Sequence, residues 1–222
     1  MSEPKSNDKH MSGDASMYTK PVLRIYDPIA LGIGCPVAWN CSRNTMLDFF
    51  NDNVREKHLD IGPGSGFFLD RATFLTSNPD IVLADLNELV LETAANRISR
   101  YSPRTMVQDA LKPLQTEEKF QSIALQNVLH CLPGTMESKA TVFDNFLRNL
   151  TSNGVLFGCT VLGKNHGLGQ LGTWMMEKYN EAGSFNNLED DLETLEAVLK
   201  SRFPRYSVRT RGAVAFFEGW AS

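Results

Sequence analysis

The sequence has few cysteines and no regular spacing between them. The four cysteines, Cys35, Cys41, Cys131 and Cys159, form no C-x-x-C pair, whereas zinc ribbons and disulfide scaffolds depend on such spacings. The chain also lacks an excess of positive charge, because 22 basic residues stand against 26 acidic residues and the formal net charge is −4. Proteins that bind a phosphate backbone generally present a basic surface, so nucleic acid is not an expected partner.

Long hydrophobic runs are absent as well. Residues 1–17 are polar and lack the apolar core of a signal peptide, and they are expected to form a flexible leader. The later stretch 22–39 is apolar, but charged residues and prolines interrupt it, so it does not resemble a membrane span. Together with the irregular spacing of the cysteines, which fits reduced thiols, these features predict a cytoplasmic protein that does not associate with membranes.

The chain has 222 residues, of which 42% are hydrophobic. This length and composition suffice for one α/β domain with a full buried core. A single domain is predicted over 18–222, with the aromatic and Gly/Pro-rich stretch 18–41 as an N-terminal cover. Strand and helix patterns then alternate. The strands are expected at 57–61, 80–85, 104–108, 120–126 and 153–161. The helices between them are expected at 66–77, 87–99 and 136–150. This alternation predicts a mainly parallel sheet with helices on both faces.

The pattern changes after the fifth strand. Residues 163–203 are predicted to form a helical insertion over a substrate pocket, with helical stretches at about 171–180 and 188–203. The acidic run 189–191 is expected in the first turn of the second stretch, where carboxylates complement the helix dipole. Two strands follow, at 205–210 and 213–218. Only Arg211 and Gly212 separate them, so a hairpin with an antiparallel last strand is predicted.

The most informative motif is LDIGPGSG, residues 59–66, which follows a strand and opens a helix. Glycines there allow a sharp turn and let free N–H groups approach a ligand. A dinucleotide site would require a small third residue, but Phe67 stands there counting from Gly62, and no lysine follows as in a P-loop. Asp60 would repel a pyrophosphate, yet it suits a ligand that presents an ammonium group, such as S-adenosylmethionine.

Two further acids stand at strand ends. Asp85 ends the second strand, where its carboxylate can accept hydrogen bonds from a ribose diol. Asp109 follows the third strand, where it can accept a hydrogen bond from an adenine amino group. Since ligands of open α/β sheets bind outside the carboxyl ends of the strands, we expect Asp60, Asp85 and Asp109 to line one crevice.

With these motifs in place, the chain resembles the class I S-adenosylmethionine-dependent methyltransferases from about residue 42 to the C-terminus. The match is strongest at LDIGPGSG, LADLN and VQDAL. The resemblance implies a Rossmann-like, seven-stranded, mostly parallel sheet whose antiparallel last strand lies between the fifth and sixth. The cofactor residues that it implies are Asp60, Gly62, Gly64 and Gly66 for the methionine part, Asp85 for the ribose, Asp109 with Ala110 for the adenine, Gln126 and Asn127 below the sulfonium, and Leu86 as a further cofactor contact.

Methyl transfer from a sulfonium needs alignment, exclusion of water and, for weak acceptors, a base. No metal is required. His130, just after the fourth strand, is a candidate base because the reference pKa of histidine is near neutrality, and a histidine that only packs below the cofactor is the alternative. His166 is predicted to orient the acceptor, with a solvated loop histidine as the alternative. Cys131 is assigned to packing.

Aromatic and polar residues on two segments are predicted to contact the substrate. These are Tyr18, Tyr26 and Trp39 from the N-terminal cover, and Gln170, Trp174, Met175 and Tyr179 from the insertion. The alternative for the second group is an ordinary core stripe of a helix. The fourth strand continues as Gln126, Asn127, Val128 and Leu129, without the D-P-P-Y or N-P-P-Y tetrad of the amino-directed branch of the family, which favours an oxygen acceptor.

The sequence therefore predicts a methyltransferase that acts on a small organic molecule, by in-line SN2 transfer to a carboxylate or hydroxyl oxygen. A small-molecule N-methyltransferase and a non-catalytic partner protein that binds S-adenosylmethionine are the alternatives, and a nicotinamide oxidoreductase is a third option. A homodimer is left open.

Overall fold

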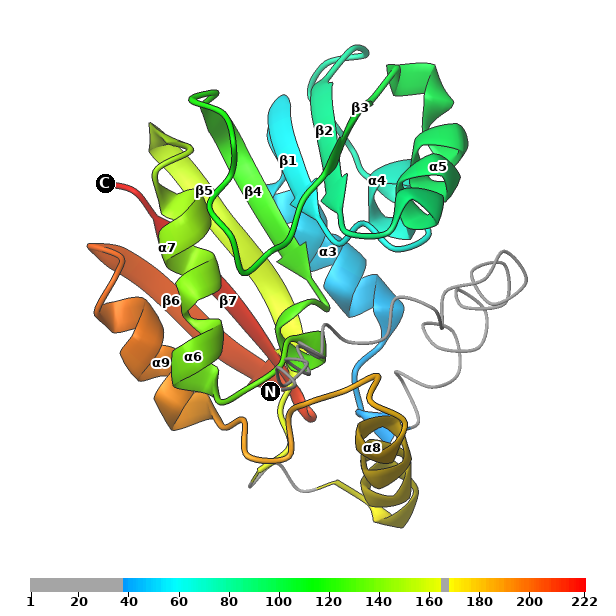
Figure 1. The fold of residues 1–222 in the computed structure, drawn as a ribbon, viewed down its shortest axis with the longest axis vertical. Helices are drawn as coiled ribbons and strands as arrows, with labels where there is room; N and C mark the ends of the chain where they lie inside the picture. Colours follow the sequence, from blue (N-terminus) through cyan, green and yellow to red (C-terminus); the bar gives the residue numbers. More distant parts are fainter. Residues whose placement is uncertain (1–37, 165–167) are drawn as a thin grey trace, which may run out of the picture.

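The computed structural model describes residues 38–164 and 168–222, and the predictions for the leader, Tyr18, Tyr26 and His166 lie outside these residues. The described strands form one seven-stranded sheet in the order β3-β2-β1-β4-β5-β7-β6 (Figure 1). The strands are β1 (Lys57–Ile61), β2 (Asp80–Asp85), β3 (Arg104–Val107), β4 (Phe120–Gln126), β5 (Leu150–Val161), β6 (Arg205–Arg211) and β7 (Val214–Trp220).

Strands β1 to β5 run parallel to one another, and β7 is antiparallel to both β5 and β6. The turn between β6 and β7 contains Gly212 at φ 58°. A Cβ at this position would lie 2.1 Å from the main-chain oxygen of Trp39, so the turn tolerates only glycine. This topology confirms the predicted fold class and the hairpin at the end of the chain.

Helices cover both faces of the sheet (Figure 1). They are α3 (Arg43–Asn53), α4 (Phe67–Arg71), α5 (Glu88–Arg97), α6 (Met136–Lys139), α7 (Thr141–Leu147), α8 (Gln170–Glu181) and α9 (Leu192–Lys200), with short 3-10 turns at Ser99–Tyr101 and Leu129–Cys131. One buried cluster packs α3, α4 and α5 on the sheet through residues such as Phe50 and Phe157. A second cluster packs α6, α7 and α9 through Phe143, Leu199 and Phe217. The sheet is therefore buried on both sides, as its apolar strands require.

Several predicted boundaries are wrong. Helix α4 ends at Arg71 instead of 77, because Ala72 takes an extended backbone conformation. The helix expected at 136–150 is two helices that meet at Ala140, and β5 begins at Leu150.

The last helix, α9, begins at Leu192 and not near 188, because the Asp191 side chain accepts a hydrogen bond from the Thr194 N–H and caps it. The acidic run 189–191 therefore precedes the helix instead of forming its first turn.

The two helices of 163–203 have different positions. α9 packs on the sheet beside α6 and β6, whereas α8 lies beyond the carboxyl ends of the strands (Figure 1). The coverage of a substrate pocket by residues 163–203 stays a prediction. In the described part of the chain, no helix is long and apolar enough to cross a membrane.

Candidate active site

A tight loop joins β1 to α4. Its three glycines all have positive φ angles, 68° at Gly62, 56° at Gly64 and 76° at Gly66, which glycine adopts without steric cost. A Cβ at Gly66 would lie 3.1 Å from the Ala94 Cα of α5, and one at Gly62 would lie 2.8 Å from Val128 Cγ2. The loop therefore packs closely between α5 and the segment after β4, and it presents backbone rather than side chains at the sheet edge.

Asp60 lies within β1 directly before this loop. Its side chain is buried, with the residue 4% exposed, and Oδ1 has no hydrogen-bond partner among the described residues. Burial, and secondly the nearby Asp85 carboxylate, raise the pKa of Asp60 to about 8. A buried carboxyl group with a free acceptor atom favours a cationic donor, because the cation offsets the loss of solvation.

Asp85 ends β2 at the same edge of the sheet. Its Oδ1 accepts a hydrogen bond from the Asn87 N–H at 2.8 Å, while burial raises its pKa. Two large apolar side chains lie exposed beside it, Leu86 at 47% and Val107 at 56%, and Val107 is the register partner of Asp85 on β3. Both side chains are therefore candidates for contact with an apolar part of a ligand. Sequence reasoning missed Val107, whose only signal was its place at the end of an edge strand.

Asp109 makes local interactions. Its Oδ1 accepts a hydrogen bond from the Leu111 N–H at 2.9 Å, and Lys112 Nζ lies 3.5 Å from Oδ2. The main-chain oxygen of Ala110 accepts a hydrogen bond from the Asn145 side chain. These local bonds stabilise the turn after β3 whether or not a ligand is bound. Contact between adenine and Asp109 or Ala110 therefore stays a prediction.

The end of β4 lies next to the glycine loop. Gln126 is buried and its Oε1 has no partner among the described residues. Asn127 follows in the left-handed region at φ 61°, a conformation that asparagine tolerates better than most residues. Its N–H donates to the main-chain oxygen of Cys159, and its Oδ1 accepts from Cys159 Sγ. These bonds turn the chain beneath Gly62, where Val128 packs.

His130 is buried just beyond this turn. The Val161 N–H donates to His130 Nδ1 at 3.2 Å, and the Thr160 hydroxyl lies 3.2 Å from the same nitrogen. Because Nδ1 accepts a main-chain hydrogen bond, the proton of the neutral ring is on Nε2. Burial, and secondly the charge of Lys139, lower the pKa of His130 to about 3. This geometry favours the packing role over the role of a base.

An aromatic cluster joins the N-terminal and helical segments. We use this term for Trp39, Tyr179, Phe185 and the His130 ring. Ring centroids are 4.3 Å apart for His130 and Phe185, 4.9 Å for Tyr179 and Phe185, and 6.1 Å for Trp39 and Phe185. Two predicted substrate residues, Trp39 and Tyr179, therefore meet, with Phe185 between them and the histidine.

The other predicted substrate residues on α8 lie differently. Trp174 is 55% exposed and Gln170 is an exposed residue in the first turn of the helix. Met175 is partly buried against the core. The structure thus brings Trp39, Tyr179 and Met175 to the body of the domain and leaves Gln170 and Trp174 at the surface of α8.

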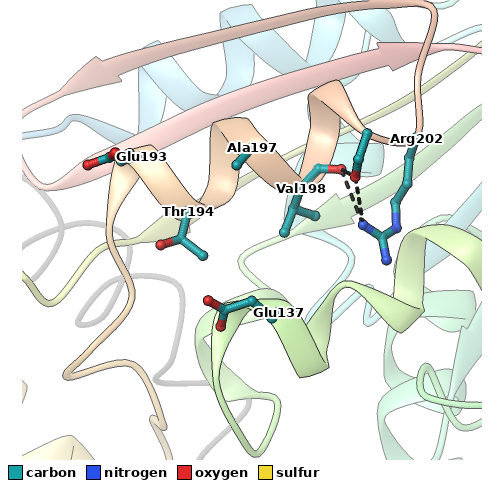
Figure 2. Close-up of a pocket in the computed structure, with 7 residues that line it drawn as sticks. Glu137, Glu193, Thr194, Ala197, Val198 and Arg202 are labelled. Atoms are coloured by element: carbon teal, nitrogen blue, oxygen red, sulfur yellow. Dashed lines mark hydrogen bonds between the residues drawn. The ribbon is translucent and has the colours of Figure 1, made fainter.

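A groove between α6 and α9 has a volume of about 450 Å³ (Figure 2). Its lining consists of Glu137, Glu193, Thr194, Ala197, Val198, Ser201 and Arg202. Arg202 donates to the main-chain oxygen of Val198 and to the Ser201 hydroxyl, so its guanidinium is already paired. None of the predicted site residues lines this groove.

Comparison with known proteins gives consistent matches. A family model described as a methyltransferase domain matches residues 59–156. The demethylluteothin O-methyltransferase of Streptomyces thioluteus is 33% identical over 97% of this chain and 94% of its own length. The N-methyltransferase vrtF of Penicillium aethiopicum is 33% identical over 81% of this chain and 76% of its own length.

Among solved structures, the N-methyltransferase NodS from Bradyrhizobium japonicum WM9, in complex with S-adenosyl-L-homocysteine, has a TM-score of 0.57 at 17% identity. The match covers 80% of this chain and 85% of NodS. It supports the fold.

The chain therefore belongs to the class I S-adenosylmethionine-dependent methyltransferases. Its methyl donor is S-adenosylmethionine and its acceptor is a small organic molecule. The site fits this donor, because the unpartnered Asp60 oxygen is suited to an ammonium group, and because a Cβ at Gly64 would meet no described atom within 4 Å, so that the loop leaves room for a ligand there.

Proposed function

We propose that the protein O-methylates a small organic acceptor, at a carboxylate or a readily ionised hydroxyl, by in-line displacement. The observation that carries this proposal is the state of His130, whose Nδ1 accepts the Val161 N–H and whose pKa is lowered to about 3. The neighbouring Cys131 thiol is no base either, because burial raises its pKa to about 12. An acceptor that is already an anion near neutral pH needs no proton removed.

The cofactor residues have distinct roles in this proposal. Bound S-adenosylmethionine supplies an electrophilic methyl group. Asp60 accepts hydrogen bonds from its ammonium, and Asp85 accepts from its ribose hydroxyls. The N–H groups of Gly62 and Gly66 already donate to the main-chain oxygens of Ala84 and Pro63, so the proposed donor of the loop to the ligand carboxylate is the Gly64 N–H. Leu86 and Val107 provide an apolar surface for the adenine, with Asp109 and Ala110 at its edge. Gln126 and Asn127 fix the turn below the sulfonium.

The aromatic cluster forms one wall of the proposed acceptor site. Trp39, Tyr179 and Phe185 present apolar surface, which excludes water from the reacting groups and strengthens electrostatic attraction there. Gln170, Trp174 and Met175 on α8, and Tyr18, Tyr26 and His166 outside the described residues, are the remaining proposed acceptor contacts. Amide and imidazole donors orient the acceptor anion, and Asn127 and His166 are the candidates for this role.

A nitrogen acceptor is the second candidate function, and the vrtF relative, which is named as an N-methyltransferase, favours it. A neutral amine is nucleophilic without a base, so the environment of His130 permits it too. The oxygen acceptor is preferred because the demethylluteothin O-methyltransferase matches nearly the full length of the chain and because the amino-directed tetrad is absent after β4.

The experiment offers the protein S-adenosylmethionine with a deuterated methyl group and acceptors matched on one aromatic skeleton. The panel holds a carboxylate, a phenol, an aliphatic alcohol and an amine, and mass spectrometry detects the labelled ester, ether or amine. Product from the carboxylate or phenol is expected. Product from the amine alone would replace this proposal with N-methylation. Donor binding without any product would support a non-catalytic partner protein.

Two further features belong to this proposal. We infer a cytoplasmic location from the irregular spacing of the four cysteines, and localisation of a fluorescent fusion tests it. A homodimer is left open by the sequence, and light scattering on a sizing column measures the mass directly against the 24.8 kDa of one chain.

A further inference from the structure

A buried ion pair connects α6 to the segment between α8 and α9. Lys139 Nζ lies 2.6 Å from Asp190 Oδ2, and the two side chains are 0% and 2% exposed. The same ammonium donates a hydrogen bond to the main-chain oxygen of Asn186. Burial lowers the pKa of Lys139 and raises that of Asp190, while each partner favours the charged form of the other.

Stability alone gives little reason for such a pair. Removing two charges from water costs several kcal/mol per ion, and well-packed apolar residues of similar volume often stabilise a protein equally well. Polar groups in such positions are retained in some proteins because they specify one arrangement of the chain.

Asn186 connects the ion pair to the aromatic cluster. Its N–H donates to the main-chain oxygen of His130 at 2.7 Å, and its main-chain oxygen accepts from Lys139. The residue is thus fixed on both sides of its backbone. Phe185 directly precedes it, and the Phe185 ring lies against His130 and Tyr179 with centroid distances of 4.3 and 4.9 Å.

We infer that Lys139 and Asp190 are positioning residues that hold Phe185, and with it the aromatic cluster, in place at the acceptor side of the site. This inference rests on the proposed function, in which the acceptor contacts that cluster. The ion pair shares no residue with the glycine loop, Asp60 or Asp85. Its loss is therefore expected to weaken acceptor binding and to leave donor binding unchanged.

The same segment has other attachments that do not involve the two charges. Asn187 Nδ2 donates to the main-chain oxygen of Val161 at 2.7 Å. The N–H groups of Gly163 and Lys164 both donate to the main-chain oxygen of Asp190 at 3.1 Å. These bonds hold the segment on the domain when the ion pair is removed, so we expect the effect of its removal at Asn186 and Phe185. These two residues then keep the bonds of the Asn186 N–H to His130, of the Asn186 Oδ1 with the Gly134 N–H, and of the Phe185 N–H to Tyr179.

The test is the double variant Lys139→Met/Asp190→Leu, which keeps similar side-chain volumes without leaving one charge unpaired. The acceptor KM should rise by at least about fivefold, or about 1 kcal/mol, while calorimetry gives an unchanged Kd for S-adenosylmethionine. The matched control is Lys164→Met/Glu189→Gln, which removes an exposed ion pair of 3.2 Å between the residues after β5 and the same segment, with side chains 48% and 79% exposed. The control should leave both constants unchanged.

A second readout does not depend on catalysis. In a Trp174→Phe/Trp220→Phe background, Trp39 is the remaining tryptophan of the chain and reports on the cluster. The double variant should shift Trp39 emission to longer wavelength and make it more accessible to acrylamide, whereas the control pair should not. This readout still tests the ion pair if no acceptor in the panel is methylated, so failure of the inference and failure of the proposed function are distinguishable.

Three results decide the inference. Unchanged acceptor KM and unchanged Trp39 emission in the folded double variant would overturn it. A rise in both the acceptor KM and the donor Kd would also overturn it, because the pair would then support the domain as a whole. If the double variant does not fold, Asp190→Asn replaces it, and unchanged Trp39 emission in that variant would again overturn the inference.

Discussion

Replacing Asp60 by Asn should remove the pH dependence of S-adenosylmethionine binding. In the ligand-free protein the pKa of Asp60 is raised from 3.8 to about 8, by burial first and by Asp85 second, so that only about a tenth of the molecules carry the carboxylate at pH 7. The ligand ammonium favours the ionised form and lowers this pKa in the complex. Binding near neutrality is therefore coupled to the release of a proton.

The magnitude follows from this coupling. Between pH 6 and pH 7 the ligand amine stays protonated, because the pKa of an α-amino group is about 8, while the ionised fraction of Asp60 rises about tenfold. The affinity of the wild-type protein should rise about tenfold per pH unit in this range, or about 1.4 kcal/mol. It should level off and then fall above pH 8 as the ligand amine loses its proton.

Isothermal titration calorimetry in two buffers of different ionisation enthalpy measures both the affinity and the number of protons released. The wild-type protein should release close to one proton at pH 7, and the Asp60→Asn variant should release none and show a flat affinity from pH 6 to pH 7. An equally flat profile without proton release in the wild-type protein would refute the assignment of Asp60 to the ammonium.

The Asp60→Asn substitution should also change the stability of the ligand-free protein. The folded pKa of Asp60, about 8, lies above its unfolded value of 3.8, so the folded ligand-free protein binds more protons than the unfolded chain between these values. Its contribution to stability is therefore present at low pH and lost as the pH rises through 8. Without ligand at pH 8, Asp60→Asn should melt above the wild-type protein, although it binds the donor less tightly.

Three further predictions concern single side chains. Asp85→Ala should weaken donor binding at least tenfold, about 1.4 kcal/mol, and unchanged affinity in calorimetry would remove Asp85 from the site. His130→Ala should lower kcat by less than about threefold in a folded variant if the ring only packs, whereas complete loss at unchanged KM would identify a base. Arg97 donates to the hydroxyl and main-chain oxygen of Ser65 in the glycine loop, so Arg97→Met should raise the donor Kd several-fold at unchanged acceptor KM. Arg71→Met serves as its control, because the Arg71 side chain is 63% exposed at the end of α4.

The cofactor side of the fold could be predicted from the sequence because its signals are local. A strand followed by closely spaced glycines, and acids at strand ends, have a physical reason that can be stated without knowing the rest of the chain. Gly62, Gly64 and Gly66 do take the backbone conformations for which glycine is required, and Asp60 and Asp85 do lie at neighbouring strands.

The acceptor side depends on contacts between distant residues, which the sequence pattern does not contain. The acidic run 189–191 is typical of a helix start, yet Asp190 is buried against Lys139, 51 residues earlier in the chain. Lys139 fits the polar positions of a surface helix and gives no local sign that it is buried. His130 has the residue type of a base, and only the structure shows that its Nδ1 already accepts a hydrogen bond from the Val161 N–H.

The most direct measurement is a crystal structure with S-adenosylhomocysteine bound. The ligand amino group is expected within hydrogen-bond distance of Asp60, its ribose hydroxyls at Asp85, and its sulfur facing the aromatic cluster of Trp39, Tyr179, Phe185 and His130. A ligand bound elsewhere, such as in the groove between α6 and α9, or a ligand in the crevice with its amino group away from Asp60, would contradict the assignment of this site.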